Sequence, residues 1–156
     1  MIYFISKEND MRYLPYIIIL SFSIIGALYT VLYINLNKKK EKDFIIYEEN
    51  ANKETEEKNK IFLLYTVCMT NIVFAVMESL LIYTRSFELI LSTNLIRTCS
   101  VIAVLNFAAM IIKGTFAGNN VNKITDREVF SKTLIQMSFG EILTVLGLLI
   151  LGFIII

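Results

Sequence analysis

One carboxyl group, that of Glu141, lies in the middle of a long apolar segment of this 156-residue sequence. Glu141 precedes Ile156 by 15 positions, or about 20 Å of helix, and residues 136–149 contain no basic side chain. A charge at the centre of a membrane costs roughly 3 kcal/mol or more, so such a residue is a functional candidate by default. Because desolvation disfavours the charged form, we expect Glu141 to rest protonated and to ionise on meeting water or an arginine. The sequence therefore predicts that Glu141 carries a proton.

A purely structural role for Glu141 is the alternative, in which the carboxyl group is hydrogen-bonded to a neighbouring helix. Gly140 leaves space for a close approach of that helix, and nearby hydroxyl and amide groups could hold the carboxyl group in either role. These supporting residues are Gln136, Ser138 and Thr144 on the same segment and Asn71 on another.

Three further polar residues lie inside apolar segments. Glu78 is a candidate second carboxylate, but it precedes Arg85 by only a few residues, so we expect it to lie near the membrane interface. Asn71 and Asn106 lie deeper, and buried asparagines of this kind usually tie helices together.

The elements that carry these residues are predicted from composition. Hydrophobic residues make up 56% of the chain, which exceeds the roughly 45–50% of an average soluble domain. Four apolar segments, about 14–36, 61–84, 89–112 and 129–156, each reach the ~20 residues that a membrane-spanning helix needs. The sequence predicts an all-α integral membrane four-helix bundle made of two transmembrane hairpins in a single domain, 1–156.

The distribution of basic residues predicts the orientation of these helices. Both hairpin loops are rich in lysine and arginine, whereas the N-terminal segment and the middle turn carry few, so we expect both loops to be cytoplasmic. The loop residues are Lys38, Lys39, Lys40, Lys42, Lys53, Lys58 and Lys60 in the first loop and Lys113, Lys123, Arg127 and Lys132 in the second.

Two connections have distinctive compositions. Residues 37–60 hold 14 of the 29 charges, of both signs, and are interpreted as a solvated connector or a docking surface for a soluble partner. Residues 113–125, with Gly114 and Gly118, are predicted to form a turn after the third span. Asp126 and Glu128 should then lie at the start of the fourth helix, where the helix dipole favours carboxylates.

Several classes of function are excluded or disfavoured by composition. The chain has no histidine, and its two cysteines, Cys68 and Cys99, lie in apolar runs, so neither a zinc site nor Ser-His or Cys-His catalysis is expected. No cofactor or metal is expected. A net charge of +1 without a dense basic face gives no indication of nucleic-acid binding.

Three stretches resemble the proteolipid subunits of rotary V-type ATPases. In residues 130–150, Glu141 is followed six residues later by Gly147 and then by an aliphatic run, which is the family's pattern around its ion-carrying glutamate. Residues 106–118 are similar to the family's Asn-containing inner helix, and residues 23–32 to its first inner helix. The c-double-prime type carries its working carboxylate in the second span, where this chain aligns Asn71, with Glu78 two turns further on. Both the c and the c-double-prime type therefore stay open.

This resemblance implies a unit of a membrane rotor ring, and a subunit of a proton-pumping ATPase complex that is not an enzyme by itself. Implied partners are other proteolipid subunits, a static membrane subunit that supplies an arginine, a cytoplasmic central-stalk subunit and the lipid bilayer. The implied cargo is H⁺, with Na⁺ less expected, and the implied location is a vacuolar or other endomembrane. Two other classes remain: a non-catalytic four-helix scaffold or assembly subunit, and a small proton-coupled transporter.

Overall fold

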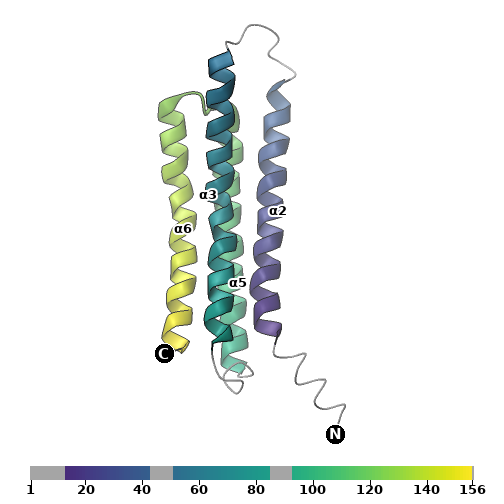
Figure 1. Ribbon diagram of the computed structural model, residues 1–156, viewed down its shortest axis with the longest axis vertical. Coiled ribbons are helices and arrows are strands. Elements are labelled where there is room, and N and C mark those ends of the chain that lie inside the picture. The colour runs from purple at the N-terminus through teal and green to yellow at the C-terminus, as the bar shows by residue number, and fades with distance from the viewer. Residues whose placement is uncertain (1–12, 43–50, 85–92, 156) are drawn as a thin grey trace.

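The computed structural model describes residues 13–42, 51–84 and 93–155, and every element in these ranges is helical. The long helices are α2 (Leu14–Lys42), α3 (Ala51–Tyr83), α5 (Thr93–Asn120) and α6 (Arg127–Ile155), and a short 3₁₀ helix, η1 (Val121–Lys123), follows α5. Helices α2 and α5 run in one direction, and α3 and α6 in the other (Figure 1). The predicted all-α four-helix bundle is confirmed.

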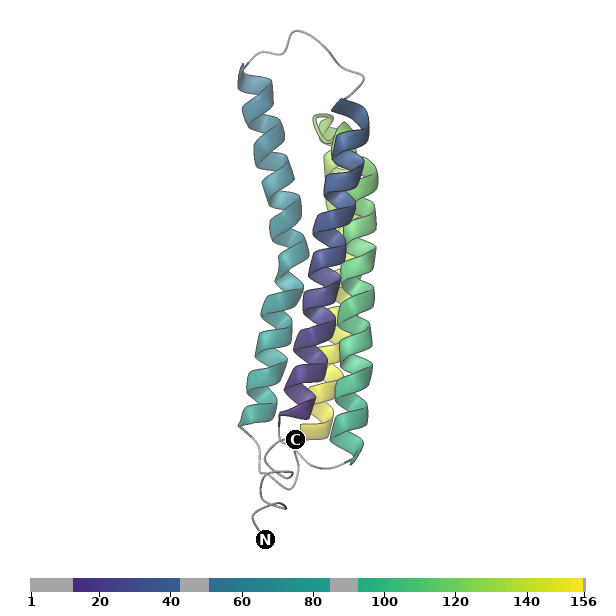
Figure 2. The ribbon, with the colours of Figure 1, turned by 90° about the vertical axis from the view of Figure 1, so that its right-hand side faces the viewer.

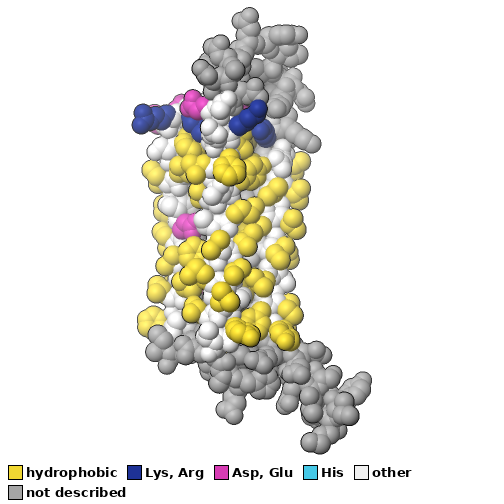
Figure 3. Space-filling model, in the orientation of Figure 1, with side chains coloured by type: hydrophobic (Ala, Val, Ile, Leu, Met, Phe, Trp, Pro, Cys, Tyr) yellow, Lys and Arg dark blue, Asp and Glu magenta, His cyan; other side chains and the backbone are white. Residues whose placement is uncertain are grey.

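All four long helices are long and apolar enough to cross a membrane. Large apolar side chains cover the outside of the bundle, among them Phe62 and Phe153, and the visible lysines and arginines gather at one end (Figure 3). A bundle that exposes so much apolar surface along its whole length is suited to lipid rather than to water. The chain has the architecture of a multi-pass integral membrane protein.

Helices α2 and α5 lie side by side along the bundle (Figure 2) and approach closely at glycines. A Cβ atom added at Gly114 would lie 2.8 Å from Thr30 Oγ1, and one at Gly118 would overlap the Tyr33 ring. The Thr30 hydroxyl also donates a hydrogen bond of 3.1 Å to the Met110 carbonyl. Small residues allow this kind of close helix contact in membranes, where van der Waals packing drives association.

The glycine-containing segment was predicted to be a turn, and this prediction is wrong for residues 113–120. Helix α5 continues to Asn120, because Gly114 and Gly118 give it a close contact with α2 rather than ending it. The charged loop is also shorter than 37–60, since α2 reaches Lys42 and α3 begins at Ala51. The rest of that loop, 43–50, lies outside the described residues.

The predicted carboxylate at the start of the fourth helix is confirmed. Asp126 Oδ1 accepts a hydrogen bond of 2.8 Å from the backbone N–H of Glu128, directly at the start of α6. This bond satisfies one of the amide groups that every helix leaves unpaired in its first turn.

Two apolar clusters form the core, one toward each end of the bundle. The first is Ile19, Ala75, Ile82, Leu95, Cys99, Ile102 and Leu151. The second is Ile34, Ile61, Leu64, Cys68, Ala117, Val121, Ile124 and Met137. The buried polar residues Asn71, Asn106, Lys113 and Thr144 lie between these two clusters, and Glu78 lies beside the first of them. The bundle thus has a polar middle between two apolar ends.

Candidate functional site

A buried ion pair forms the centre of the polar middle. The Lys113 ammonium group on α5 donates a hydrogen bond to Glu141 Oε1 on α6. The Lys113 side chain is fully buried, whereas 30% of the Glu141 side chain is exposed on the outside of the bundle. The pair thus joins a cation held in the interior to a carboxylate that reaches the lipid-facing surface.

Helix α3 supplies the remaining acceptors for the ammonium group. Lys113 Nζ lies 2.9 Å from Thr70 Oγ1 and 3.2 Å from the Val67 carbonyl, and it also donates to Asn71 Oδ1. The Thr70 hydroxyl lies 2.6 Å from Glu141 Oε1, so it can serve the same carboxylate oxygen. An ammonium group has only donors, and here oxygen atoms of two neighbouring helices surround it.

Asn71 extends the network to a second point on α6. Its Nδ2 group donates a 2.8 Å hydrogen bond to Thr144 Oγ1, which in turn lies 3.3 Å from the Gly140 carbonyl. Both Asn71 and Thr144 are fully buried. The prediction that Asn71 ties helices together is confirmed.

Gly140 leaves room for the Lys113 side chain to pack against α6. A Cβ atom at this position would lie 2.8 Å from Lys113 Cγ and 2.8 Å from the Ala109 carbonyl oxygen of α5. The space expected beside Glu141 is therefore present, and the backbone of α5 and the stem of Lys113 fill it.

Two predicted supporting residues do not join the site. Ser138 is exposed and donates a 2.6 Å hydrogen bond to the Ile135 carbonyl of its own helix. Gln136 is partly exposed, and within the described ranges it makes no hydrogen bond with Glu141. Ser138 points away from the buried side of α6, and Gln136, five residues before Glu141, lies about 140° around the helix from it.

Sequence reasoning missed Lys113, because the basic partner of Glu141 comes from the third span and not from the fourth. Lys113 was assigned to a cytoplasmic turn, but α5 continues past it and buries it. One signal could have found it. Lys113 follows Asn106 by seven residues, so that both lie on one face of a helix, and Asn71 and Glu78 have the same spacing.

A second polar layer lies two helical turns from the ion pair. Asn106 Nδ2 on α5 donates a 2.7 Å hydrogen bond to Glu78 Oε2 on α3, and a Cβ atom at Gly147 of α6 would lie 3.5 Å from Glu78 Oε1. Glu78 and Asn106 are both fully buried. The prediction of an interfacial Glu78 is therefore wrong, because its side of α3 faces α5 and not the lipid or water.

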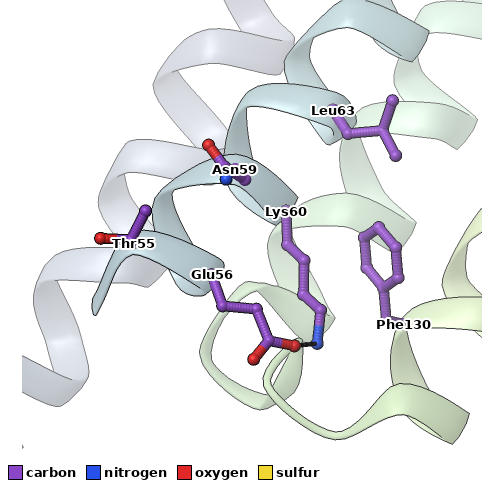
Figure 4. A pocket seen from close by; sticks show the side chains of 6 residues that line it. All are labelled: Thr55, Glu56, Asn59, Lys60, Leu63 and Phe130. Atoms are coloured by element: carbon purple, nitrogen blue, oxygen red, sulfur yellow. Dashed lines mark ion pairs between the residues drawn. The ribbon is translucent and has the colours of Figure 1, made fainter. Parts of the chain in front are cut away.

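An open surface pocket of about 480 Å³ lies at the basic end of the bundle, apart from both polar layers. Lys60 lines it, and its ammonium group lies 2.7 Å from Glu56 and 5.5 Å from the centre of the Phe130 ring (Figure 4). Lys60 also donates a 3.0 Å hydrogen bond to the Thr125 carbonyl. These contacts fasten the start of α3 to the start of α6.

Comparisons with known proteins give no match to this chain among family models, curated proteins or solved structures.

The site thus consists of a carboxylate at the bundle surface, a buried ammonium group and a shell of hydroxyl, amide and carbonyl oxygens. The Lys113 ammonium group and the Thr70 hydroxyl both contact the same carboxylate oxygen, Glu141 Oε1.

Proposed function

We propose that the protein is a proton-translocating proteolipid subunit in the rotor ring of a rotary V-type ATPase, with Glu141 as the proton carrier. The observation that carries this proposal is the position of Glu141. Its carboxyl group lies midway along α6 and is partly exposed on the outside of an apolar bundle. A carboxyl group placed there can meet a neighbouring membrane subunit and can also travel through lipid when neutral.

The packing of the bundle supports the same proposal. Helices α2 and α5 resemble the inner helices of the family, and they approach each other at Gly114 and Gly118. Helix α6 packs on α5, and its Glu141 side chain is partly exposed at the surface of the bundle. A ring needs a narrow inner layer and an outer layer that presents the carrier, and these two features support such an arrangement.

Lys113 changes how the carrier would work. When Glu141 is ionised, the ion pair with Lys113 leaves the site with no net charge, so the carboxylate can stay in a low-dielectric environment. When Glu141 takes up a proton, Lys113 loses its charge partner and the site carries one net positive charge, while Thr70, Asn71 and the Val67 carbonyl remain as acceptors for the ammonium group. An arginine on a static subunit would compete with Lys113 for the carboxylate.

The same contacts favour H⁺ over Na⁺ as the cargo. A dehydrated sodium ion would need several oxygen ligands beside Glu141, and the Lys113 ammonium group already occupies the centre of the available oxygens. A proton needs only the one carboxylate oxygen.

A scaffold or assembly subunit is the second candidate, and a specific observation favours it. Glu141 contacts both α3, through Thr70, and α5, through Lys113, so its carboxylate fastens three helices together. In that role the ion pair would hold the bundle, and no proton would need to reach it.

For the proton carrier we further propose that both hairpin loops face the cytoplasm of a vacuolar or other endomembrane. The end of the bundle that carries Lys60, Lys123 and Arg127 would then face the central stalk, and other proteolipid subunits would flank the chain.

Proton pumping by the intact membrane complex tests the proposal. Glu141→Gln should abolish ATP-driven proton uptake into vesicles while the ring still assembles, because glutamine keeps the size of the side chain but carries no proton. Glu128→Gln, which changes a carboxylate of the same helix outside the site, is the matched control and should pump normally. Normal pumping by Glu141→Gln would refute the carrier role and favour the scaffold. Purification of the chain without any soluble ATPase partner would refute the rotor proposal and favour a small proton-coupled transporter.

A further inference from the structure

The layer formed by Glu78 and Asn106 contains two oxygen atoms without a hydrogen-bond partner among the described residues. Asn106 Nδ2 donates to Glu78 Oε2, which leaves Glu78 Oε1 and Asn106 Oδ1, and both of these atoms are buried and unpaired. Buried polar atoms are nearly always hydrogen-bonded, so two unpaired oxygens on two side chains already in contact need an explanation.

Both unpaired atoms are acceptors when Glu78 is ionised, so neither can satisfy the other. One added hydrogen changes this situation. If Glu78 Oε1 carries a proton, its O–H group is a donor, and the free Asn106 Oδ1 is an acceptor on the side chain that already bonds Glu78. The acid and the amide can then form two reciprocal hydrogen bonds, N–H to Oε2 and O–H to Oδ1.

We propose that Glu78 binds a proton inside the membrane and forms a reciprocal acid–amide pair with Asn106. This makes Glu78 a second proton-binding site of the chain, separate from Glu141. The site is enclosed: the side chains of Glu78 and Asn106 are fully buried, whereas Glu141 reaches the surface. A proton at Glu78 therefore exchanges with its surroundings less readily than one at Glu141.

Among the described residues, the groups around Glu78 offer no positive charge to hold it as an anion. Gly147 of α6 faces its carboxyl group, and Cys99 of α5 and Tyr16 of α2 belong to or pack on the adjoining apolar cluster. Lys113 lies two turns away along α5, about 10 Å, and is held by Glu141. Arg97, on the other side of Asn106, is exposed. An isolated buried carboxylate is costly, and protonation removes that cost.

A monovalent metal ion between the two free oxygens is the competing explanation. It would bring Oε1 and Oδ1 together without a proton, and it would keep Glu78 ionised. The two explanations differ in whether Glu78 carries hydrogen, which vibrational spectroscopy detects directly.

Infrared spectroscopy of the purified chain in lipid vesicles at neutral pH tests the proposal. All measurements are made in the Glu141→Gln variant, which removes the other carboxyl group in the middle of the described spans, so that the signal can be assigned to Glu78. We expect the carbonyl-stretch band of a protonated carboxyl group, shifted in D₂O. The band should disappear in Glu78→Gln, whose amide can still pair with Asn106, and should persist in Glu128→Gln.

Asn106→Leu gives a test that does not depend on the folding of Glu78→Gln. Loss of the amide should move the band to higher frequency, because the protonated carboxyl group then lacks its partner. Absence of the band, or its loss on addition of Na⁺ alone, would overturn the proposal. These outcomes are independent of proton pumping, so the Glu78 site can fail while the proposed function of Glu141 stands, and the reverse.

Discussion

The ion pair between Lys113 and Glu141 is expected to contribute to stability in an asymmetric way, because only Lys113 is fully buried. Lys113→Met leaves a partly exposed carboxyl group that keeps the Thr70 hydroxyl, so we expect a loss of about 2 kcal/mol in the free energy of unfolding. Glu141→Leu leaves a fully buried ammonium group without a charge partner. We expect that change to cost about 3–5 kcal/mol.

The double variant, Lys113→Met with Glu141→Leu, removes both charges at once. We expect it to cost about as little as Lys113→Met alone, because no buried charge remains unpaired. The coupling energy between the two positions should then be about 3–5 kcal/mol. Hydrogen bonds between neutral groups in membrane proteins average only about 0.6 kcal/mol in such cycles, so the ion pair should stand clearly above them.

Reversible unfolding in detergent micelles, followed by circular dichroism, provides the free energies for this double-mutant cycle. Two results would refute the reasoning. Additive effects, with a coupling energy below about 0.5 kcal/mol, would mean that the two side chains do not act as a pair. A smaller loss in Glu141→Leu than in Lys113→Met would mean that burial does not set the cost.

Three further predictions use the same unfolding assay. Gly140→Ala should lower the free energy of unfolding by about 1–3 kcal/mol, because the new methyl group would meet both the α5 backbone and Lys113. Gly152→Ala has open space and should raise it by up to about 1 kcal/mol through helix propensity. Equal effects of the two substitutions would contradict the close contact at Gly140. Asn71→Leu should lower the free energy of unfolding by about 1–3 kcal/mol, since Lys113 and Thr144 each lose a hydrogen-bond partner. An unchanged stability would exclude a stabilising role for the Asn71 amide. Lys60→Ala should lose less than about 1 kcal/mol and show that loss mainly at low salt, and a salt-independent loss would count against its ion pair as the cause.

The four spans followed from the sequence because an apolar run of about 20 residues has few other structural solutions. Glu141 was identifiable for the same reason, as a charge in a place that lipid disfavours. The helix ends were less predictable. Gly114 and Gly118 look like a turn in the sequence, but their role is set by α2, which contacts them from a distant part of the chain.

The partners of the carboxyl groups depended on tertiary structure in the same way. Lys113 could be assigned to Glu141 only once α5 was known to continue through it, and no residue near Glu141 in the sequence indicates it. Glu78 lies close to the end of its span, which favours an interfacial position, yet its side of α3 packs on α5. Distance from the end of a helix predicts depth, but it does not predict which face is covered.

The equal spacing of polar residues on α3 and α5 fixes how the two antiparallel helices are aligned. Asn71 meets Lys113 while Glu78 meets Asn106, so both contacts exist only at one longitudinal setting of the two helices. Sliding α3 by a single residue would move it about 1.5 Å and turn it by about 100°, which would break both contacts together. In lipid, apolar side chains of two helices pack almost as well when the helices are shifted along each other, so these two polar contacts specify a single alignment of α3 and α5.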